Sequence, residues 1–280
     1  METTHTLVNG CPTNLVSAGD RGLLYGDGVF RTLRVSAGRA LWWLDQYAKL
    51  ASDAARLAIP CPSRADWEAD IAACLNRAGE QDGGQDGGQA GVLRLTLTRG
   101  EGPRGYAPPH TPLSTRLLQF SPLPADVDLP SLGQIHLCRL RLAPQPALAG
   151  VKHLNRLEQV LARAEWTDPA IAEGLLLDAE DRLISGLSSN LFLMRGRTLY
   201  TPRLDRCGVA GVARDRLMAR APALGHSVQV TDLSRADLDA AEAIFLCNSV
   251  RGLRWVAEMG GRSWALHPAF TALRECLWAD

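Results

Sequence analysis

Residues 149–166 read AGVKHLNRLEQVLARAEW, and they include Lys152, one of only two lysines among the 30 basic residues of the chain. An arginine can replace a lysine as a surface charge, but a guanidinium stays protonated and cannot act as an amine nucleophile. A lysine that persists in such an arginine-rich chain therefore indicates amine chemistry at position 152. The alternative is a surface lysine without a function, and the count alone does not decide between them.

The stretch after Lys152 has the spacing of an amphipathic helix, which predicts a helix over 154–166 with a packed face. The apolar residues that recur at this spacing are Leu154, Leu157, Val160, Leu161 and Ala164. Lys152 would then lie at the start of a rigid helix. Desolvation there would lower its pKa toward that of the free amine that Schiff-base chemistry requires.

The composition predicts an enzyme that acts on a small molecule. The chain has 280 residues, 46% of them hydrophobic, which is enough for one large domain or two of ordinary size. Thirty acidic and thirty basic side chains cancel, so the net charge does not favour nucleic acid. The start METTHTLVNG lacks a signal-peptide pattern, and no apolar run approaches transmembrane length. We therefore expect a cytoplasmic protein without a nucleic-acid or membrane partner.

Cysteine and histidine patterns do not indicate a disulfide framework or a metal site. The seven cysteines are odd in number, scattered and without a C-x-x-C pair, which is typical of a reducing compartment. The six histidines show no ligand spacing. The motifs G-x-S-x-G, H-E-x-x-H and the P-loop are absent, so the common hydrolase classes are not supported.

The pattern of apolar residues predicts two mixed α/β domains. Residues 1–120 form the smaller domain, with strands at VFRTLRV, ALWWL and GVLRLTLTRG and helices at 45–58 and 64–78. The proline-bearing stretch 121–133 is the predicted linker. Residues 134–280 form the larger domain, in which strands precede and follow a helix at 211–222. The Gly-rich stretch 80–89 is predicted to be a mobile surface loop.

Two further stretches suggest binding sites for anions. Residues 205–217, DRCGVAGVARDRL, place Gly208 and Gly211 directly before a helical run, where backbone N–H groups and the helix dipole can hold a phosphate. Residues 99–109, RGEGPRGYAPP, present Arg99, Arg104 and Tyr106 on a loop that follows a strand. Arginine binds carboxylates with two parallel hydrogen bonds, so this loop suits an acidic substrate. Both patterns also occur as ordinary loops, so neither is decisive alone.

Four stretches together carry a resemblance to a known family. DRGLLYGDGVFRTLRV, TRGEGPRGY, GVKHLNRLEQVLAR and SSNLFLMRGRTLYTPRLDRCGVAGVAR occur in this order between about residue 20 and residue 255. They resemble the branched-chain aminotransferase-like enzymes of fold type IV, which use pyridoxal 5′-phosphate. The resemblance implies a two-domain mixed α/β fold with the cofactor in the interdomain cleft, and a homodimer. Within the family, AGVKHLNRLEQV and RGEGPRGY are most similar to lyases that convert 4-amino-4-deoxychorismate to 4-aminobenzoate and pyruvate in folate biosynthesis.

The resemblance also implies roles for individual residues. Lys152 would bind the cofactor covalently and act as the catalytic base. The expected phosphate-binding residues are Gly211, Val212, Ala213 and Ser249, and Asn190 would line the cofactor. Phe30 and Arg104 would contact the substrate, with Arg99 and Tyr106 as further carboxylate-binding candidates.

Two positions depart from the family pattern. Ser185 stands where relatives carry a glutamate that hydrogen-bonds the pyridine nitrogen, and a hydroxyl stabilises a protonated ring less well than a carboxylate does. This favours a lyase driven by aromatisation over the alternative, a D-amino-acid or branched-chain transaminase. Lys49 stands where relatives carry a phosphate-binding arginine, so it is expected to contact the cofactor and is a second candidate for the covalent lysine. A non-catalytic cofactor-binding homologue is the remaining alternative.

Overall fold

The computed structural model describes residues 5–81 and 89–279. The chain forms two compact units, and the boundary between them lies inside the stretch 121–133. The first unit contains Met1–Ala125 together with Lys152–Asn155, and the second contains Asp126–Val151 and Arg156–Asp280. The segment that carries Lys152 therefore belongs to the first unit, although the sequence suggested the second. Most of the predicted loop at 80–89 lies outside the described residues.

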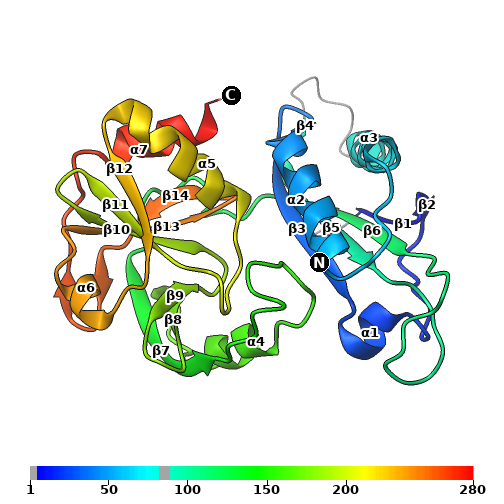
Figure 1. Ribbon diagram of the computed structural model, residues 1–280. Coiled ribbons are helices and arrows are strands. Elements are labelled where there is room, and N and C mark those ends of the chain that lie inside the picture. Colours follow the sequence, from blue (N-terminus) through cyan, green and yellow to red (C-terminus); the bar gives the residue numbers. More distant parts are fainter. Residues whose placement is uncertain (1–4, 82–88, 280) are drawn as a thin grey trace. The chain divides into compact units, whose positions relative to one another are not determined.

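The first unit is built around an antiparallel sheet of six strands in the order β2-β1-β6-β5-β3-β4 (Figure 1). Its elements are β1 (His5–Val8), β2 (Cys11–Pro12), α1 (Arg21–Tyr25), β3 (Gly28–Ser36), β4 (Arg39–Ala40), α2 (Trp43–Arg56), α3 (Arg64–Gln81), β5 (Gly91–Thr98) and β6 (Thr115–Ser121). The alternation seen in GVLRLTLT gives β5 one apolar face, on which Leu93, Leu95 and Leu97 are fully buried.

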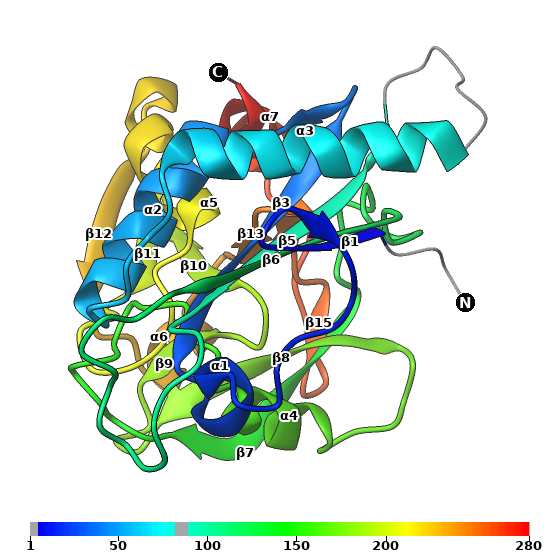
Figure 2. The same ribbon diagram turned by 90° about the vertical axis from the view of Figure 1, so that its right-hand side faces the viewer.

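Helices α2 and α3 cover the apolar face of this sheet (Figure 2). Ion pairs between helix and strand mark the contact: Asp53 of α2 pairs with Arg31 of β3, and Asp70 of α3 pairs with Arg116 of β6. The helices predicted at 45–58 and 64–78 are thus confirmed, with ends shifted by a few residues. The opposite face of the sheet carries the polar half of the alternating pattern.

The strand predicted at ALWWL is wrong over most of its length. Strand β4 ends at Ala40, and helix α2 begins at Trp43. Between them the backbone of Trp42 adopts a positive φ of 56°, a conformation that ends a strand and turns the chain. The four apolar side chains that suggested a strand are used in a turn and in the first turn of a helix.

The second unit is a mixed sheet with helices around it. Its strands are β7 (Gln134–Leu142), β8 (Ile171–Asp178), β9 (Leu183–Gly186), β10 (Asn190–Arg195), β11 (Thr198–Pro202), β12 (Ser227–Thr231), β13 (Ala243–Asn248), β14 (Gly252–Trp255), β15 (Glu258–Met259) and β16 (Arg262–Ser263). Its helices are α4 (Leu157–Arg163), α5 (Val212–Arg220), the 3₁₀ turn η1 (Ala221–Leu224), α6 (Arg235–Asp239) and α7 (Phe270–Trp278).

The sheet runs β12-β11-β10-β9-β8-β7-β15-β16, and β13 pairs with β10 and β14. The continuous apolar run of β8 is explained by burial on both faces: Leu175 and Leu177 belong to one core cluster, and Leu176 belongs to another with Cys138 and Trp166. The mixed helix-and-sheet architecture agrees with the expected fold class.

The packed face predicted for residues 154–166 is wrong. Helix α4 covers only Leu157–Arg163, and the side chains of Leu157, Val160 and Leu161 are 75%, 61% and 61% exposed. The helix packs through Ala162, which is fully buried, while Glu158 accepts a hydrogen bond from the backbone of Ala143. The apolar side of this helix therefore faces outward in the single chain.

Candidate active site

The segment Lys152–Asn155 is fixed along the start of β3 and does not belong to a helix. The backbone N–H of Phe30 donates to the carbonyl of Lys152 at 3.0 Å, and the N–H of Leu154 donates to the carbonyl of Gly28 at 2.9 Å. The amide of Asn155 donates to Gly26. Helix α4 begins only at Leu157, so the predicted placement at the mouth of a helix is wrong. A strand-like edge holds Lys152 instead.

The amine of Lys152 lies against the ring of Phe30, and the predicted site roles of both residues stay predictions. The Lys152 Nζ is 4.3 Å from the centroid of the Phe30 ring. Arg94 of β5 places its guanidinium carbon 4.2 Å from the same centroid. Because Phe30 pairs with Thr96 and Thr32 with Arg94, the side chains of Phe30 and Arg94 share the face of the sheet opposite α2 and α3. An amine, an aromatic ring and a guanidinium therefore lie together.

Arg94 is a functional candidate that the sequence analysis missed. Its side chain is exposed on this face, yet desolvation by the surrounding protein lowers the pKa of its guanidinium. A partly desolvated cation next to an aromatic ring is suited to bind the carboxylate of a flat substrate. The period-two pattern VLRLTLT could have revealed it, since Arg94 falls on the polar face of the strand.

Lys49 lies beside a buried carboxylate. Its Nζ is 2.8 Å from Oδ1 of Asp53, four residues later on α2. Oδ2 of Asp53 accepts a hydrogen bond from Arg31 and another, at 3.0 Å, from the backbone N–H of Lys152. An ammonium in an ion pair is a poor nucleophile. This contact argues against Lys49 as the covalent lysine, and its predicted contact with a phosphate stays a prediction.

The stretch that is expected to bind a phosphate lies in the second unit, at the start of α5. Gly211 is the N-cap of this nine-residue helix, followed by Val212 and Ala213. The amide of Asn190 donates to the carbonyl of Val209 at 2.8 Å and accepts from the N–H of Gly211 at 3.2 Å. A Cβ at position 211 would lie 2.4 Å from the Asn190 Oδ1, so any larger residue would displace the Asn190 amide from its hydrogen bonds.

Hydrogen bonds connect the stretch before α5 to the residues just before Lys152. Gly150, two residues before Lys152, donates its N–H to the carbonyl of Gly208 at 2.9 Å and accepts from the N–H of Ala210 at 3.1 Å. The backbone just before Lys152 and the backbone just before α5 are thus hydrogen-bonded to each other. Gly208, with a φ of +83°, supplies the left-handed turn that this pairing needs.

Ser185 and Ser249 lie near Asn190. Ser185 is buried on β9 and is the direct cross-strand partner of Asn190, so the two side chains point to the same face. Ser249 follows β13 directly, and the pairing of Asn190 with Cys247 brings the end of β13 beside the start of β10. Asn248 shapes the turn there, because its Oδ1 accepts from the N–H groups of Val250 and Arg251.

These residues fit pyridoxal phosphate. The N–H groups at the start of α5 are placed for a phosphate, Gly211 leaves room where a Cβ would collide, and Lys152 provides an amine for the aldehyde. A hydroxyl at Ser185, in place of a carboxylate, fits a ring nitrogen that accepts a hydrogen bond and is not protonated.

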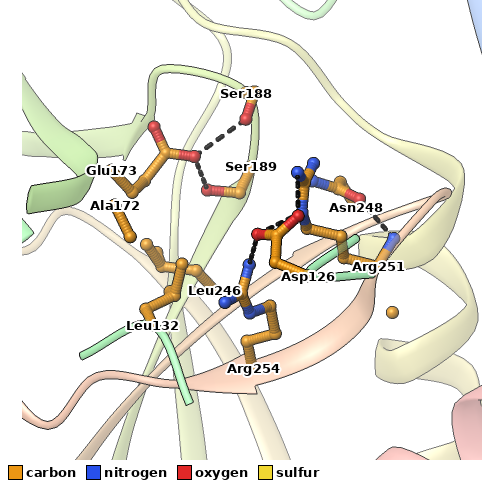
Figure 3. Close-up of a pocket in the computed structure, with 11 residues that line it drawn as sticks. Asp126, Leu132, Ala172, Glu173, Ser188, Ser189, Leu246, Asn248, Arg251 and Arg254 are labelled. Carbon is orange, nitrogen blue, oxygen red and sulfur yellow. Dashed lines mark hydrogen bonds and ion pairs between the residues drawn. The ribbon is translucent and has the colours of Figure 1, made fainter. Parts of the chain in front are cut away.

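A pocket of the second unit borders these stretches, as Figure 3 shows. On one side Glu173 accepts hydrogen bonds from Ser188 Oγ at 2.8 Å and Ser189 Oγ at 3.2 Å, and from the N–H of Leu187 at 3.0 Å. On the other side Asp126 pairs with Arg251 and Arg254. Glu173 therefore holds the turn between Ser185 and Asn190 in place, and it was missed because a single acid in an apolar strand carries no motif.

The three predicted substrate-binding residues of the loop after β5, Arg99, Arg104 and Tyr106, differ in burial and in contacts. Arg99 is buried and donates to both oxygens of Asp27, at 2.8 and 3.1 Å, and to the carbonyls of Leu57 and Ala58. These contacts argue against the predicted substrate role of Arg99, which instead fixes the end of β5. Arg104 is exposed, and Tyr106 is 86% exposed with its ring against Tyr25 at 5.5 Å.

Comparison with known proteins gives the family. The model of the class IV amino-transferase family matches residues 28–259. An aminodeoxychorismate lyase of Vibrio harveyi is 33% identical over 248 residues, which cover 88% of each chain. The crystal structure of 4-amino-4-deoxychorismate lyase from Pseudomonas aeruginosa superposes with a TM-score of 0.88 at 43% identity over 97% of each chain.

A more distant structure agrees in fold. A hypothetical aminotransferase from Mycobacterium tuberculosis in its pyridoxal-phosphate-bound form is 21% identical, with a TM-score of 0.81 over 98% of this chain and 97% of the other. The chain belongs to the class IV amino-transferase family, the fold type IV enzymes that use pyridoxal 5′-phosphate.

Proposed function

We propose that the protein is an aminodeoxychorismate lyase, which converts 4-amino-4-deoxychorismate to 4-aminobenzoate and pyruvate and so supplies a folate precursor. The observation that carries this proposal is the amine of Lys152 against the ring of Phe30, with the guanidinium of Arg94 on the same face. This arrangement suits a substrate that has a ring, an amine and carboxylates. The two similar lyases support the assignment.

Each residue has a part in this reaction. Bound pyridoxal phosphate withdraws electrons from the substrate carbon that carries the amine. Lys152 removes the proton from that carbon, the C–O bond to the enolpyruvyl group breaks, and the ring becomes aromatic. A proton from Lys152 or from water then converts the departing enolpyruvate to pyruvate. Phe30 offers a flat surface to the substrate ring. Arg94 and Arg104 bind its carboxylates, and each charged hydrogen bond contributes about 1.5–3 kcal/mol.

The residues expected to bind the cofactor can each be given a role. We propose that the N–H groups of Val212 and Ala213, the hydroxyl of Ser249 and the ammonium of Lys49 bind the phosphate. Gly211 leaves room for it, and Asn190 fixes the position of Gly211 through the hydrogen bond to its N–H. Ser185 hydrogen-bonds the ring nitrogen.

Ser185 favours the lyase over a transaminase. A transaminase must delocalise negative charge fully into the cofactor, and a carboxylate opposite the ring nitrogen helps by keeping that nitrogen protonated. In the lyase, formation of a benzene ring drives the reaction, so a hydroxyl is tolerated. A D-amino-acid or branched-chain transaminase is the second candidate, because a D-alanine aminotransferase is similar in sequence and a branched-chain amino acid aminotransferase is similar in fold.

The test is turnover of 4-amino-4-deoxychorismate by the purified protein loaded with pyridoxal phosphate. Release of pyruvate and 4-aminobenzoate by the native protein, and its loss in both Lys152→Ala and Lys152→Arg, would support the proposal. Lys152→Arg keeps the charge but not the amine chemistry, so it is the matched control for electrostatics. Amino-group transfer to a keto acid without pyruvate release would identify a transaminase. Cofactor binding with neither activity would indicate a non-catalytic homologue.

We also propose a homodimer in the cytoplasm. Helix α1 and the loop after β5 lie side by side, since Arg21 donates to the carbonyls of 105–107. Large exposed apolar residues gather on these two segments and just before them: Leu15, Leu23, Leu24, Tyr106 and Leu113. Such a group marks a protein interface. No helix in the described ranges is long and apolar enough to cross a membrane.

The dimer is tested by light scattering. Leu23→Ser combined with Leu24→Ser should convert the dimer to a monomer, because both side chains are mostly exposed in the single chain and would be buried by a partner. Leu129→Ser, at an exposed leucine in the other unit, should leave the dimer intact. A wild-type protein that is monomeric at micromolar concentration would refute the proposal.

A further inference from the structure

Asp53 is the most deeply buried carboxylate near either lysine. It has no exposed surface, and it lies on the inner side of α2 with Gln46, Leu50 and Ala54. An ionised carboxylate is strongly destabilised inside a protein unless charges and hydrogen bonds compensate for the lost water. A fully buried acid on this side of the helix therefore requires stabilising partners.

The partners of Asp53 come from three separate segments of the chain and include both lysines. They are Arg31 on the neighbouring strand, the ammonium of Lys49 at 2.8 Å and the backbone N–H of Lys152 at 3.0 Å. One carboxylate thus contacts both lysines of the chain, although one of them is 99 residues away in sequence. Arg31 alone would satisfy a structural ion pair, but it would not explain the contact with Lys152.

We propose that Asp53 is the positioning residue for the covalent lysine. It fixes the N–H of Lys152, while the N–H of Phe30 fixes the carbonyl of the same residue at 3.0 Å. Because both backbone groups of Lys152 are hydrogen-bonded, its backbone dihedral angles are restrained. Its side chain is thereby directed toward the ring of Phe30. The inference rests on the proposed function only in taking Lys152 as the lysine that reacts with the cofactor.

The same carboxylate sets the position of Lys49. The ion pair holds the ammonium near the segment that carries Lys152, with 20% of the Lys49 side chain exposed. Asp53 acts through the two lysines and does not itself contact the substrate. Its removal should therefore reduce the reaction of Lys152 with any aldehyde, and in addition weaken the binding of a phosphate.

The experiment measures covalent trapping of two aldehydes on the purified full-length protein. Pyridoxal phosphate or pyridoxal, which lacks the phosphate, is added with borohydride, and the modification of Lys152 is followed by mass spectrometry. The variant is Asp53→Ala. The matched control is Asp70→Ala, because Asp70 is also a buried carboxylate, paired with Arg116 in the same unit, but contacts neither lysine. Thermal unfolding of both variants shows how much stability each loses.

We expect Asp53→Ala to slow trapping of pyridoxal at Lys152 by about 10- to 100-fold, the usual effect of a small misplacement of a reacting group. The effect on pyridoxal phosphate should be larger, since Lys49 also loses its position. Asp70→Ala should trap both aldehydes as fast as the native protein. Trapping of pyridoxal by Asp53→Ala at the native rate would overturn the proposal, even if pyridoxal phosphate binds weakly.

If Asp53→Ala does not fold, Asp53→Asn provides the test. Asparagine keeps an oxygen for the N–H of Lys152 but loses the charge that holds Lys49. Trapping of pyridoxal should then stay within about threefold of native, because the hydrogen bond to the N–H of Lys152 is kept. Equal loss for pyridoxal and pyridoxal phosphate in Asp53→Asn would contradict the role of the hydrogen bond.

These results do not depend on turnover. If trapping follows the expected pattern but 4-amino-4-deoxychorismate is not converted, the lyase assignment fails and the role of Asp53 stands. If Lys152→Ala is trapped at the same rate as the native protein, Lys152 is not the covalent lysine, and the proposal for Asp53 fails with it.

Discussion

Replacing Gly211 with alanine tests the phosphate cradle most directly. A Cβ at this position would lie 2.4 Å from the Asn190 Oδ1, which is 0.6 Å short of the 3.0 Å limit that real Cβ contacts respect. The backbone of Asn190 cannot move away, because β10 is paired with β9 on one side and β13 on the other. The side-chain amide must therefore rotate out of its present position.

The expected loss follows from the hydrogen bonds of that amide. Asn190 makes two of them, to Val209 and to the N–H of Gly211, and each contributes about 0.5–1.5 kcal/mol. Gly211→Ala should thus lower the free energy of unfolding of the cofactor-free protein by about 1–3 kcal/mol. If one N–H at the start of α5 is also displaced from the phosphate, affinity for pyridoxal phosphate should fall by about 10- to 100-fold, the equivalent of one charged hydrogen bond.

The assay compares the dissociation constants of pyridoxal phosphate and pyridoxal by visible absorbance. Gly211→Ala should weaken pyridoxal phosphate much more than pyridoxal, because only the former has a phosphate. Gly19→Ala is the matched control, since a Cβ there would meet its nearest atom at an ordinary 3.5 Å. Equal weakening of both aldehydes, or no weakening at all, would refute the assignment of this helix start as the cradle.

Three further outcomes are expected. Arg94→Met should raise the KM for 4-amino-4-deoxychorismate by about 10- to 100-fold with a smaller change in kcat, as expected for loss of one charged hydrogen bond; an unchanged KM would exclude Arg94 from the substrate site. Burial raises the pKa of Asp27, but the hydrogen bonds from Arg99 and Arg21 outweigh burial and lower this pKa. The ionised Asp27 therefore contributes to stability above pH ~3.9, and this contribution disappears as the pH falls through the lowered pKa. Melting temperatures between pH 2 and 6 should therefore fall less steeply for Asp27→Asn than for the native protein, and parallel curves would contradict this. Iodoacetamide at pH 8 should modify the exposed Cys11 in the native state and Cys138 only after unfolding, because burial raises the pKa of the Cys138 thiol to about 12; peptide mapping decides.

The pattern of apolar residues predicted the strands correctly where the apolar residues are buried within the same unit. The alternation in GVLRLTLT and the continuous apolar run of GLLLD both correspond to observed strands, with burial on one face and on two faces respectively. The pattern failed in α4, where the apolar side faces outward in the single chain. Periodicity shows that a helix has an apolar side, but it does not show which surface covers that side.

The candidate site residues also fall into two groups, those within a local motif and those placed by contacts between distant segments. Lys152, Gly211 and Phe30 lie in contiguous motifs, so the sequence alone was sufficient to propose them as site residues. Arg94 and Asp53 are placed near Phe30 and Lys152 by strand register and by a contact between distant segments, which no local spacing reveals. For Asp53 there was one usable signal, an acid at helical spacing from Leu50 and next to Ala54 on the buried side of the helix.

The contacts of Asp53 also explain why position 49 carries a lysine. Oδ1 of Asp53 receives the Lys49 ammonium, whereas Oδ2 receives Arg31 and the N–H of Lys152. An arginine at 49 would bind both carboxylate oxygens through its planar fork and would compete with the N–H of Lys152. Lys49→Arg should therefore keep the positive charge for the phosphate yet slow trapping of pyridoxal at Lys152, by a factor of about three to ten, the equivalent of one net hydrogen bond. A Lys49→Arg protein that traps pyridoxal at the native rate would show that the two lysines are not linked through Asp53.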